Sequence, residues 1–235
     1  MDSLAEKYID TNGGDIWIFY KDDDGNEQHW VFNGSNHKQA PKTKDNFTSN
    51  FLMAYDYNIR NGGGEFMQLA ATSKDLTINL KYGENTLYIP NPRDGSAPYI
   101  QWNPNLGIKT DGGHVLSPAT ILEHEADHNV RRIQDPNGFM EDAGYKSNGY
   151  RYVNDSQYDF KEERRVIRGS ERNTAYNNRE FPLNYVRPDH DKGSFITVTS
   201  PISTGLLMPA VRRNIMNKQR SIVPSILRTL RGGGR

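Results

Sequence analysis

Two histidines and a glutamate lie close together in the middle of the chain, in the segment His124-Glu125-Ala126-Asp127-His128. In a helix, residues four apart project from the same face, so both imidazoles can bind one divalent ion. The glutamate beside the first histidine is then near enough to take a proton from a metal-bound water. The H-E-x-x-H pattern therefore predicts a hydrolytic centre with His124 and His128 as zinc (Zn²⁺) ligands and Glu125 as the catalytic base.

The flanking residues favour a helix around this motif. Ser117 is a suitable N-cap, Pro118 fits the first turn, and a turn sequence at 135–138 follows the motif. We therefore expect a central helix with its histidines turned away from an apolar stripe. A surface helix with two solvated histidines is the alternative. The apolar stripe consists of Ala119, Leu122, Ala126, Val130 and Ile133.

A catalytic zinc needs a third protein ligand and keeps one position for water. Asp159 and Glu162 have the spacing of a capping box that opens a second helix, and Gly169 is placed to end it. Glu163 lies in the middle of the apolar face of that helix, where a carboxylate is costly unless it is paired or metal-bound. Glu163 is the predicted third ligand, and an ion pair with an arginine is the alternative. Three other residues stay open as ligands: Glu162, Glu171 and His190.

The oxyanion of a tetrahedral intermediate needs a hydrogen-bond donor. Tyr185, Arg179 and His190 follow the second helix. Tyr185 is preferred, because a phenol can donate without competing for zinc. His114 is expected to be an ordinary loop residue, or alternatively a contact to substrate. An extended substrate could pair with an edge strand, for which the segment 98–104 is the candidate.

The remaining patterns predict an α+β fold that is rich in loops, with a small mixed or antiparallel sheet and an edge strand beside the central helix. A helix is expected over 44–60, ended by the glycines 62–64. Prolines around two of the strands favour sheet edges. The expected strands are a hairpin of 15–20 and 28–32, followed by 75–81, 87–89, 99–103 and 195–199.

Length and composition are those of one domain with appendages: 235 residues, 34% hydrophobic and 25% charged. Cysteine is absent, which excludes disulfides, Cys-ligated zinc, iron–sulfur clusters and thiol nucleophiles. The sequence contains no run of about 18 apolar residues and no recognisable Sec-type signal, so we expect no membrane span. We divide the chain into an N-terminal hairpin extension (1–43), a metallopeptidase domain (44–205) and a basic tail (206–235).

Charge is unevenly distributed, although 29 basic and 29 acidic residues balance each other overall. Residues 1–205 contain 22 basic and 29 acidic residues, a net charge of −7, which gives no reason to expect nucleic-acid binding. Residues 206–235 contain seven basic residues and no acidic one. This tail could dock on an acidic partner or a membrane surface, and the alternative is a poorly ordered terminus.

The segments 117–128 and 162–171 resemble effector-type zinc metallopeptidase domains, which occur at the C-termini of bacterial Rhs-type polymorphic toxins. They also resemble the zinc-protease effectors that enteropathogens inject by type III secretion. The resemblance extends through 58–64 and 102–107, and so covers about residues 45–200. It implies a zincin-like fold of the gluzincin type, with the motif histidines and one glutamate of the 162–163 pair as ligands. The family pattern usually has a small residue where this chain has Asp127.

The spacing from His128 to the acidic pair is also similar to that in clostridial neurotoxin light chains. Those enzymes use a downstream arginine and tyrosine, which favours Arg179 and Tyr185 here. The resemblance implies a toxin that is secreted by a specialised apparatus and cleaves a protein in the target-cell cytoplasm. It also implies an immunity protein or a secretion chaperone as a further partner. The alternatives are a non-catalytic interaction module with a structural or degenerate zinc helix, and a zinc amidase acting on another substrate.

Overall fold

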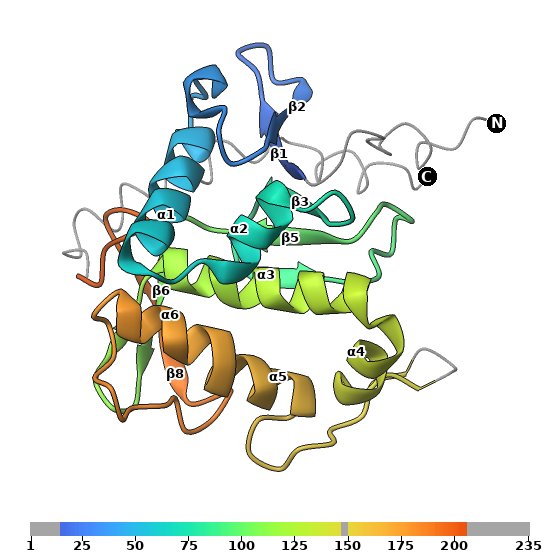
Figure 1. The fold of residues 1–235 in the computed structure, drawn as a ribbon, viewed down its shortest axis with the longest axis vertical. Coiled ribbons are helices and arrows are strands. Elements are labelled where there is room, and N and C mark those ends of the chain that lie inside the picture. Colours follow the sequence, from blue (N-terminus) through green and yellow to red (C-terminus); the bar gives the residue numbers. More distant parts are fainter. Residues whose placement is uncertain (1–14, 147–149, 206–235) are drawn as a thin grey trace, which may run out of the picture.

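A computed structural model describes residues 15–146 and 150–205 of the chain (Figure 1). The fold is mixed α and β, as the sequence predicts, and it has two small sheets where one was expected. None of the helices in these two ranges combines the length and the apolar character needed to cross a membrane. The predictions for the basic tail 206–235 lie outside the described residues.

The first sheet is mixed and has five strands in the order β2-β1-β3-β5-β4. Strands β1, β3 and β5 run parallel to one another, whereas β2 and β4 pair antiparallel at the two ends. All five were expected at nearly these positions. Their bounds are β1 Asp15–Lys21, β2 Glu27–Phe32, β3 Thr77–Tyr82, β4 Leu87–Ile89 and β5 Tyr99–Trp102.

The N-terminal hairpin shares the sheet and the core of the residues that follow it. Strand β1 pairs in parallel with β3, which places Ile16 beside Ile78 and Ile18 beside Leu80. These four side chains are fully buried and belong to one core cluster. The expected boundary at residue 43 therefore does not separate two cores.

The predicted edge segment 98–104 does not form an edge, because β5 is paired on both sides, with β3 and with β4. Strand β4 is the outer strand at this end of the sheet, and β2 is the outer strand at the other end. A proline excludes a strand from the centre of a sheet only when the proline lies within the paired residues, because it cannot donate a backbone hydrogen bond there. Here Pro98 and Pro104 lie just outside β5, so all its backbone groups remain available for pairing.

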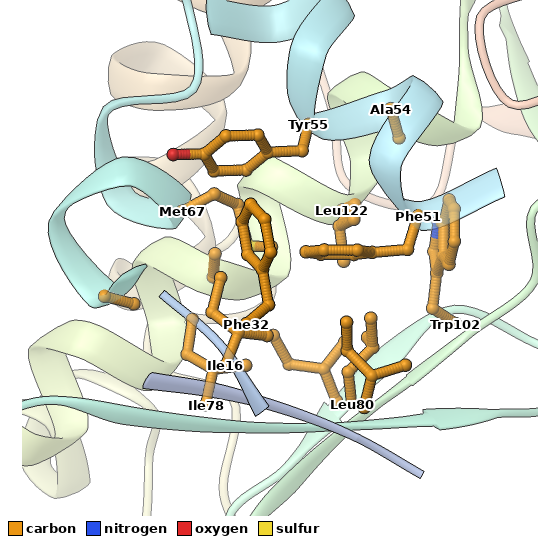
Figure 2. Close-up of a cluster of buried hydrophobic side chains, with 14 of the residues drawn as sticks. Ile16, Phe32, Phe51, Ala54, Tyr55, Met67, Ile78, Leu80, Trp102 and Leu122 are labelled. Carbon is orange, nitrogen blue, oxygen red and sulfur yellow. The ribbon is translucent and has the colours of Figure 1, made fainter. Parts of the chain in front are cut away.

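The main core lies between this sheet and three helices (Figure 2). Phe47, Phe51 and Tyr55 recur every fourth residue along the first helix and face the core, as predicted. Gly62 ends that helix in the left-handed region, with φ 87°, which a side chain would disfavour. A further short helix after Gly64 was not predicted. The three helices are α1 Phe47–Asn61, α2 Glu65–Thr72 and α3 Pro118–Gln134.

Helix α3 is the central element, with the sheet, α1 and α2 on one side and α5 and α6 on the other (Figure 1). Ala119, Leu122 and Ala126 pack into the core, and Val130 is buried, as the apolar stripe predicts. The prediction is wrong for Ile133, which is 42% exposed because the last turn of α3 extends past the elements that cover the rest. Both faces of α3 are therefore buried over most of its length.

The N-terminus of α3 is held by buried polar groups from several segments. The hydroxyl of Ser117 accepts a hydrogen bond from the Thr120 N–H at 3.3 Å, which confirms the predicted N-cap. The Asn58 amide of α1 donates to the Ala119 carbonyl at 2.8 Å, and the Trp102 indole donates to the Pro118 carbonyl at 3.0 Å. These bonds fix the start of the helix that carries the motif.

The second predicted helix is one kinked segment that continues further than expected. Phe160, and not Asp159, is its N-cap residue, because Asp159 adopts φ 63° and its carboxylate pairs with His190. Gly169 does not end the helix. Its non-helical φ and ψ bend the chain, and the helix resumes beyond the bend. The segment comprises α5 Lys161–Val166, the π-helical turn η3 Ile167–Glu171 and α6 Arg172–Asn177.

A second, antiparallel sheet and a short helix complete the surroundings of α3. The strand expected at 195–199 is present two residues earlier, and the other two strands were not predicted. The short helix replaces the turn expected after the motif, with Asp135 as its N-cap. These elements are β6 Leu106–Thr110, β7 Val115–Leu116, β8 Gly193–Thr197 and α4 Pro136–Asp142.

Glu180 is a buried carboxyl group at the start of α3. Its Oε2 accepts a hydrogen bond from the Ser117 N–H at 3.1 Å, while its Oε1 is buried with no hydrogen-bond partner among the described residues. Burial raises the pKa of Glu180 from 4.5 to about 7. The folded chain therefore keeps this group protonated at pH values where the unfolded chain ionises it, so the group costs stability as the pH rises from about 4.5 to 7.

We predict that Glu180→Gln stabilises the protein at pH 8 by on the order of 2–3 kcal/mol, because the amide cannot ionise. The gain should shrink as the pH falls and vanish below about pH 4.5, where both folded and unfolded chains are protonated. Denaturant unfolding at several pH values measures this. Glu27→Gln, at an exposed position of β2, is the control and should show no such trend. An equal effect of Glu180→Gln at acid and alkaline pH would contradict the prediction.

Candidate metal centre

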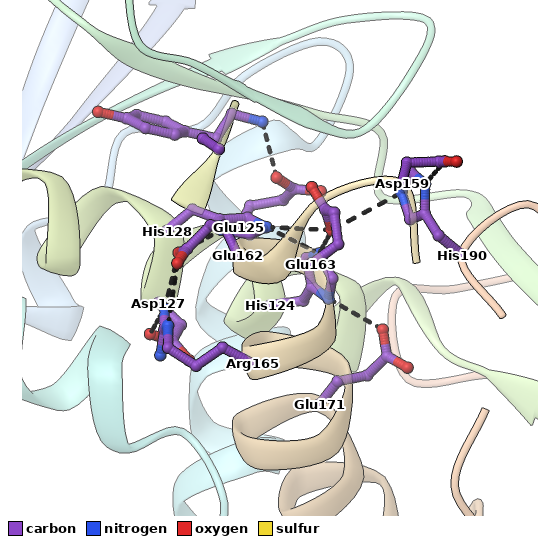
Figure 3. A network of polar contacts seen from close by, with 12 residues as sticks. His124, Glu125, Asp127, His128, Asp159, Glu162, Glu163, Arg165, Glu171 and His190 are labelled. Carbon is purple, nitrogen blue, oxygen red and sulfur yellow. Dashed lines mark hydrogen bonds and ion pairs between the residues drawn. The ribbon is translucent and has the colours of Figure 1, made fainter. Parts of the chain in front are cut away.

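His124 and His128 project from the same face of α3, and their Nε2 atoms lie 3.1 Å apart. Glu163 of α5 reaches both rings. Its Oε2 lies 3.3 Å from Nε2 of His124 and 3.4 Å from Nε2 of His128. Figure 3 shows the three side chains converging from the two helices. The structure thus brings together the three residues that the sequence proposed as ligands.

These three atoms form a group that could hold a metal ion. Their separations of 3.1, 3.3 and 3.4 Å are close to the edge of a tetrahedron, about 3.3 Å, for bonds of about 2.0–2.1 Å. Oε2 of Glu163 is buried and has no hydrogen-bond partner in the described ranges. The two imidazoles compensate its charge, and a cation bound among the three atoms would compensate this buried oxygen directly.

Without a cation, the two imidazoles and the carboxylate share protons. Burial alone would lower the pKa of His124, but the carboxylates of Glu163 and Glu171 outweigh it and raise the pKa to about 9. Burial alone would raise the pKa of Glu163, but the adjacent His128 and His124 hold it well below its usual value. A metal ion must displace these protons, so binding is expected to strengthen as the pH rises.

Each imidazole has a second carboxylate on its other nitrogen. Oε2 of Glu171 lies 2.9 Å from Nδ1 of His124, and Oε1 of Glu162 lies 2.9 Å from Nδ1 of His128. These contacts favour the tautomer that keeps the proton on Nδ1 and leaves the Nε2 lone pair free for a metal. Of the glutamates left open as third ligand, Glu162 and Glu171 therefore orient the histidines, and Glu163 faces the Nε2 atoms.

Arginines neutralise both orienting carboxylates. Arg187 is only 4% exposed and donates to both oxygens of Glu171, at 3.0 and 2.6 Å. Arg131 and Arg165 donate to Glu162. Burial would raise the pKa of each glutamate, but the arginines and the adjacent histidines lower it to about 2. Both carboxylates therefore stay charged across the physiological range and keep their imidazoles oriented.

Asp127 occupies the position where the resembled family has a small residue. It is buried and accepts hydrogen bonds from Arg165 and from the Ser170 hydroxyl, both at 2.6 Å. Asp127 thus ties α3 to the kinked segment on the side of the centre. The sequence contains no signal for this contact, because the partners lie 38 and 43 residues away.

Glu125 links the motif to the edge of the main sheet. Its side chain is largely buried, and its Oε2 accepts a hydrogen bond from the main-chain N–H of Tyr88 in β4 at 2.7 Å. Because the N–H and C=O of one strand residue point to the same side, the Tyr88 carbonyl also lies on the outer edge of β4. The strand beside the motif is therefore β4, and not the predicted segment 98–104.

Two cavities adjoin at this centre. The smaller, about 250 Å³, extends towards the second sheet and includes Ile108, Ile121 and Phe195. The larger, about 410 Å³, lies between β4 and α4. Their shared lining residues are Thr86, His124, Glu125 and His190.

Tyr185 is not brought to the centre, contrary to the prediction. Its hydroxyl bonds the Thr110 hydroxyl at 2.9 Å, and its ring packs against His114 and Phe181, with centroid distances of 4.3 and 4.6 Å. It lines neither cavity, because it belongs to a separate apolar cluster beside the second sheet. Arg179 lies with His114 at a different surface hollow, so neither residue contributes to the centre.

His190 occupies the position expected for the tyrosine. It lines both cavities, and its Nε2 lies 3.6 Å from Oε2 of Glu163. Its Nδ1 lies 3.0 Å from Oδ2 of Asp159, which fixes the ring (Figure 3). The sequence offered His190 only as a weaker ligand or donor, because nothing local places its irregular segment above the motif.

Comparisons of the chain with models of protein families, with curated proteins and with solved structures find no match. A functional assignment therefore depends on the chemistry of the centre and on the resemblance carried by the motif.

We predict that Glu171→Gln weakens zinc binding about 10- to 100-fold, because an amide cannot accept from both Arg187 and His124 as the carboxylate does. Competition with a chromophoric chelator at neutral pH measures the affinity. Glu141→Gln, at an exposed position of α4, is the matched control and should bind like the wild type. If Glu171→Gln binds zinc as tightly as the wild type does, the carboxylate of Glu171 does not contribute to zinc binding by His124.

Proposed function

We propose that this chain is a zinc-dependent endopeptidase of the zincin-like, gluzincin type. His124, His128 and Glu163 are the proposed ligands, and Glu125 is the proposed base. The observation that carries the proposal is the buried Oε2 of Glu163, which lies within 3.4 Å of both Nε2 atoms and makes no hydrogen bond among the described residues. Zinc is the proposed ion because two imidazoles and one carboxylate are typical of catalytic zinc, with the fourth position left for water.

Bound zinc supplies an acidified water and polarises the scissile carbonyl. Glu125 follows His124 directly and lines both cavities, so its carboxylate can receive the proton of that water. It can then deliver the proton to the leaving amine. The hydrogen bond from the Tyr88 N–H holds one of its oxygens and leaves the other for this transfer.

The surroundings of the centre suit an extended peptide. The outer edge of β4 offers main-chain groups with which a substrate strand can pair. The two cavities provide space for side chains on both sides of the cleaved bond. Room on both sides favours cleavage within a chain over removal of a terminal residue.

His190 is the proposed donor to the oxyanion. The contact of Nδ1 with Asp159 orients the ring, so Nε2 is the nitrogen that can donate towards the centre. It lies on the side of Glu163 that faces the cavities. A preformed donor of this kind stabilises the charge that develops in the transition state.

The resemblance adds a biological setting to this proposal. It supports a toxin that is delivered by a specialised secretion system and cleaves a protein in the cytoplasm of the target cell. An immunity protein or a secretion chaperone would then be a partner of the same chain.

We predict that Glu125→Gln retains stoichiometric zinc but lowers peptide cleavage by about 10²- to 10⁴-fold, because the amide cannot accept the proton. Zinc is measured by elemental analysis, and toxicity is measured on expression in a bacterium. Wild-type toxicity of Glu125→Gln would instead favour a non-catalytic interaction module. A third outcome is that Glu125→Gln loses toxicity, but cells intoxicated by the wild type contain no new protein N-terminus. That outcome would favour an amidase acting on another substrate.

We predict that His190→Gln lowers kcat by about 10²- to 10³-fold with zinc content unchanged, since the oxyanion loses the donor that the ring of His190 supplies. Tyr185→Phe is the matched control, because it removes a hydroxyl that bonds only Thr110, and it should keep wild-type kcat. Steady-state kinetics on one peptide compare the two variants. A larger loss in Tyr185→Phe than in His190→Gln would reverse this assignment.

A further inference from the structure

The larger cavity beside the centre has a rigidly held arginine in its wall. Nε of Arg151 donates to the Ala143 carbonyl at 2.8 Å. The guanidinium carbon lies 3.8 Å from the ring centroid of Phe160 and 5.1 Å from that of Tyr145. Stacking on two rings restricts a side chain that is otherwise long and flexible. The charge is therefore held in place before any ligand arrives.

Arg151 has no acidic partner within ion-pair distance among the described residues, in contrast to the other arginines around the centre. The carboxylates that line the same cavity are engaged elsewhere. Glu162 pairs with arginines of α3 and α5, Glu163 faces the two imidazoles, and Glu125 accepts from β4. A guanidinium always carries its charge, so this cavity contains a cation that a ligand can neutralise.

The wall also contains five apolar residues and one further unused polar group. The hydroxyl of Tyr88 is buried and has no hydrogen-bond partner in the described part of the chain. Apolar side chains beside a fixed cation and a spare hydroxyl are complementary to a short apolar stem that ends in a carboxylate. The apolar lining residues are Leu87, Ile89, Pro90, Phe139 and Ala143.

We propose that this cavity is the specificity subsite for a substrate carboxylate, with Arg151 as the residue that recognises it. The proposal rests on the proposed peptidase function. The carboxylate can come from an Asp or Glu side chain next to the cleaved bond or from the C-terminus of the peptide. In either case a planar guanidinium binds a carboxylate through two parallel hydrogen bonds, and a neutral amide leaves the charge unpaired.

The charges of the centre do not oppose this subsite. A divalent ion among Glu163, Glu125 and two neutral imidazoles gives a balanced charge, because two carboxylates match the two positive charges. Glu162 is neutralised by Arg131 and Arg165. Among the basic side chains that line the larger cavity, Arg151 is the one that has no opposite charge within ion-pair distance in the described ranges.

The first experiment uses the full chain loaded with zinc and an amine-blocked tryptic digest of a bacterial proteome as the peptide pool. New N-termini are identified by mass spectrometry. We expect Asp and Glu to be enriched several-fold at one fixed position relative to the cleaved bond. Arg151→Gln should lose this enrichment, whereas Arg151→Lys should retain part of it. Arg168→Gln, an exposed arginine of the kinked segment that lines neither cavity, is the matched control.

The second experiment uses one cleaved sequence synthesised with Glu or Gln at the preferred position, each as the free acid and as the C-terminal amide. For the wild type, exchange of Glu for Gln should lower kcat/KM about 10- to 100-fold, and Arg151→Gln should abolish the difference. Loss of cleavage only on amidation identifies the chain terminus as the source. Equal rates for all four peptides, or a Glu preference that persists in Arg151→Gln, would overturn the inference.

A binding measurement separates failure of this inference from failure of the peptidase proposal. Fluorescein-labelled Ala-Ala-Glu-Ala-Ala and Ala-Ala-Gln-Ala-Ala, both amidated, and a free-acid Ala-Ala-Gln-Ala-Ala are titrated with wild type and Arg151→Gln. If no peptide is cleaved, yet a carboxylate peptide binds the wild type at least several-fold more tightly and Arg151→Gln does not discriminate, the subsite stands and the peptidase proposal fails. If peptides are cleaved without any preference for a carboxylate, the peptidase proposal stands and the subsite inference fails.

Discussion

The carboxylate of Glu163, buried between two imidazoles, is the constraint on which the surrounding structure depends. An isolated buried charge is costly, and it persists only where other charges or a metal compensate it. The interface between α3 and the kinked segment places further carboxylates around it, each matched by an arginine, a histidine or a hydroxyl. Among the carboxylate oxygens that face the two imidazoles in the described residues, Oε2 of Glu163 has no hydrogen-bond partner. This is the oxygen that a cation could bind together with both Nε2 atoms.

This constraint explains why the central helix is buried on two sides of different character. One side carries Ala119, Leu122 and Ala126 into the apolar core, and the other carries His124 and His128 into an ionic layer. The bend at Gly169 lies between Glu163 and Glu171, which reach opposite nitrogens of the same His124 ring. The kinked segment thus supplies both a metal-facing oxygen and an orienting one.

The main sheet contacts the motif through a main-chain hydrogen bond of its outer strand β4. The hydrogen bond from the Tyr88 N–H to Glu125 fastens the outer strand β4 beside the motif. The same strand forms one wall of the larger cavity, opposite α4 and near Arg151. This bond places the outer edge of β4 directly beside Glu125 and the wall of the larger cavity.

The sequence alone determined the parts of this site that depend on helical periodicity. His124, Glu125 and His128 are placed by the geometry of one helix, and the apolar face of α5 singled out Glu163, because both arguments need only neighbours within a few residues. Neighbouring residues also sufficed to predict three further features. These are the N-cap at Ser117, the end of α1 at Gly62 and the approximate positions of five strands.

Only the tertiary structure decided which strand lies at the edge of the sheet beside the centre. It also decided which side chain of the 185–190 segment faces the centre and which charged residues pair with the carboxylates around it. The order β3-β5-β4 arises from pairing between segments with no local code for rank in a sheet. Tyr185 and His190 lie five residues apart in an irregular segment, where no periodicity predicts which side chain turns inward. Arg187 reaches Glu171 across 16 residues, and Arg165 reaches Asp127 across 38. Such pairs form because buried charges must be neutralised where the elements meet, and that meeting place is a property of the folded chain.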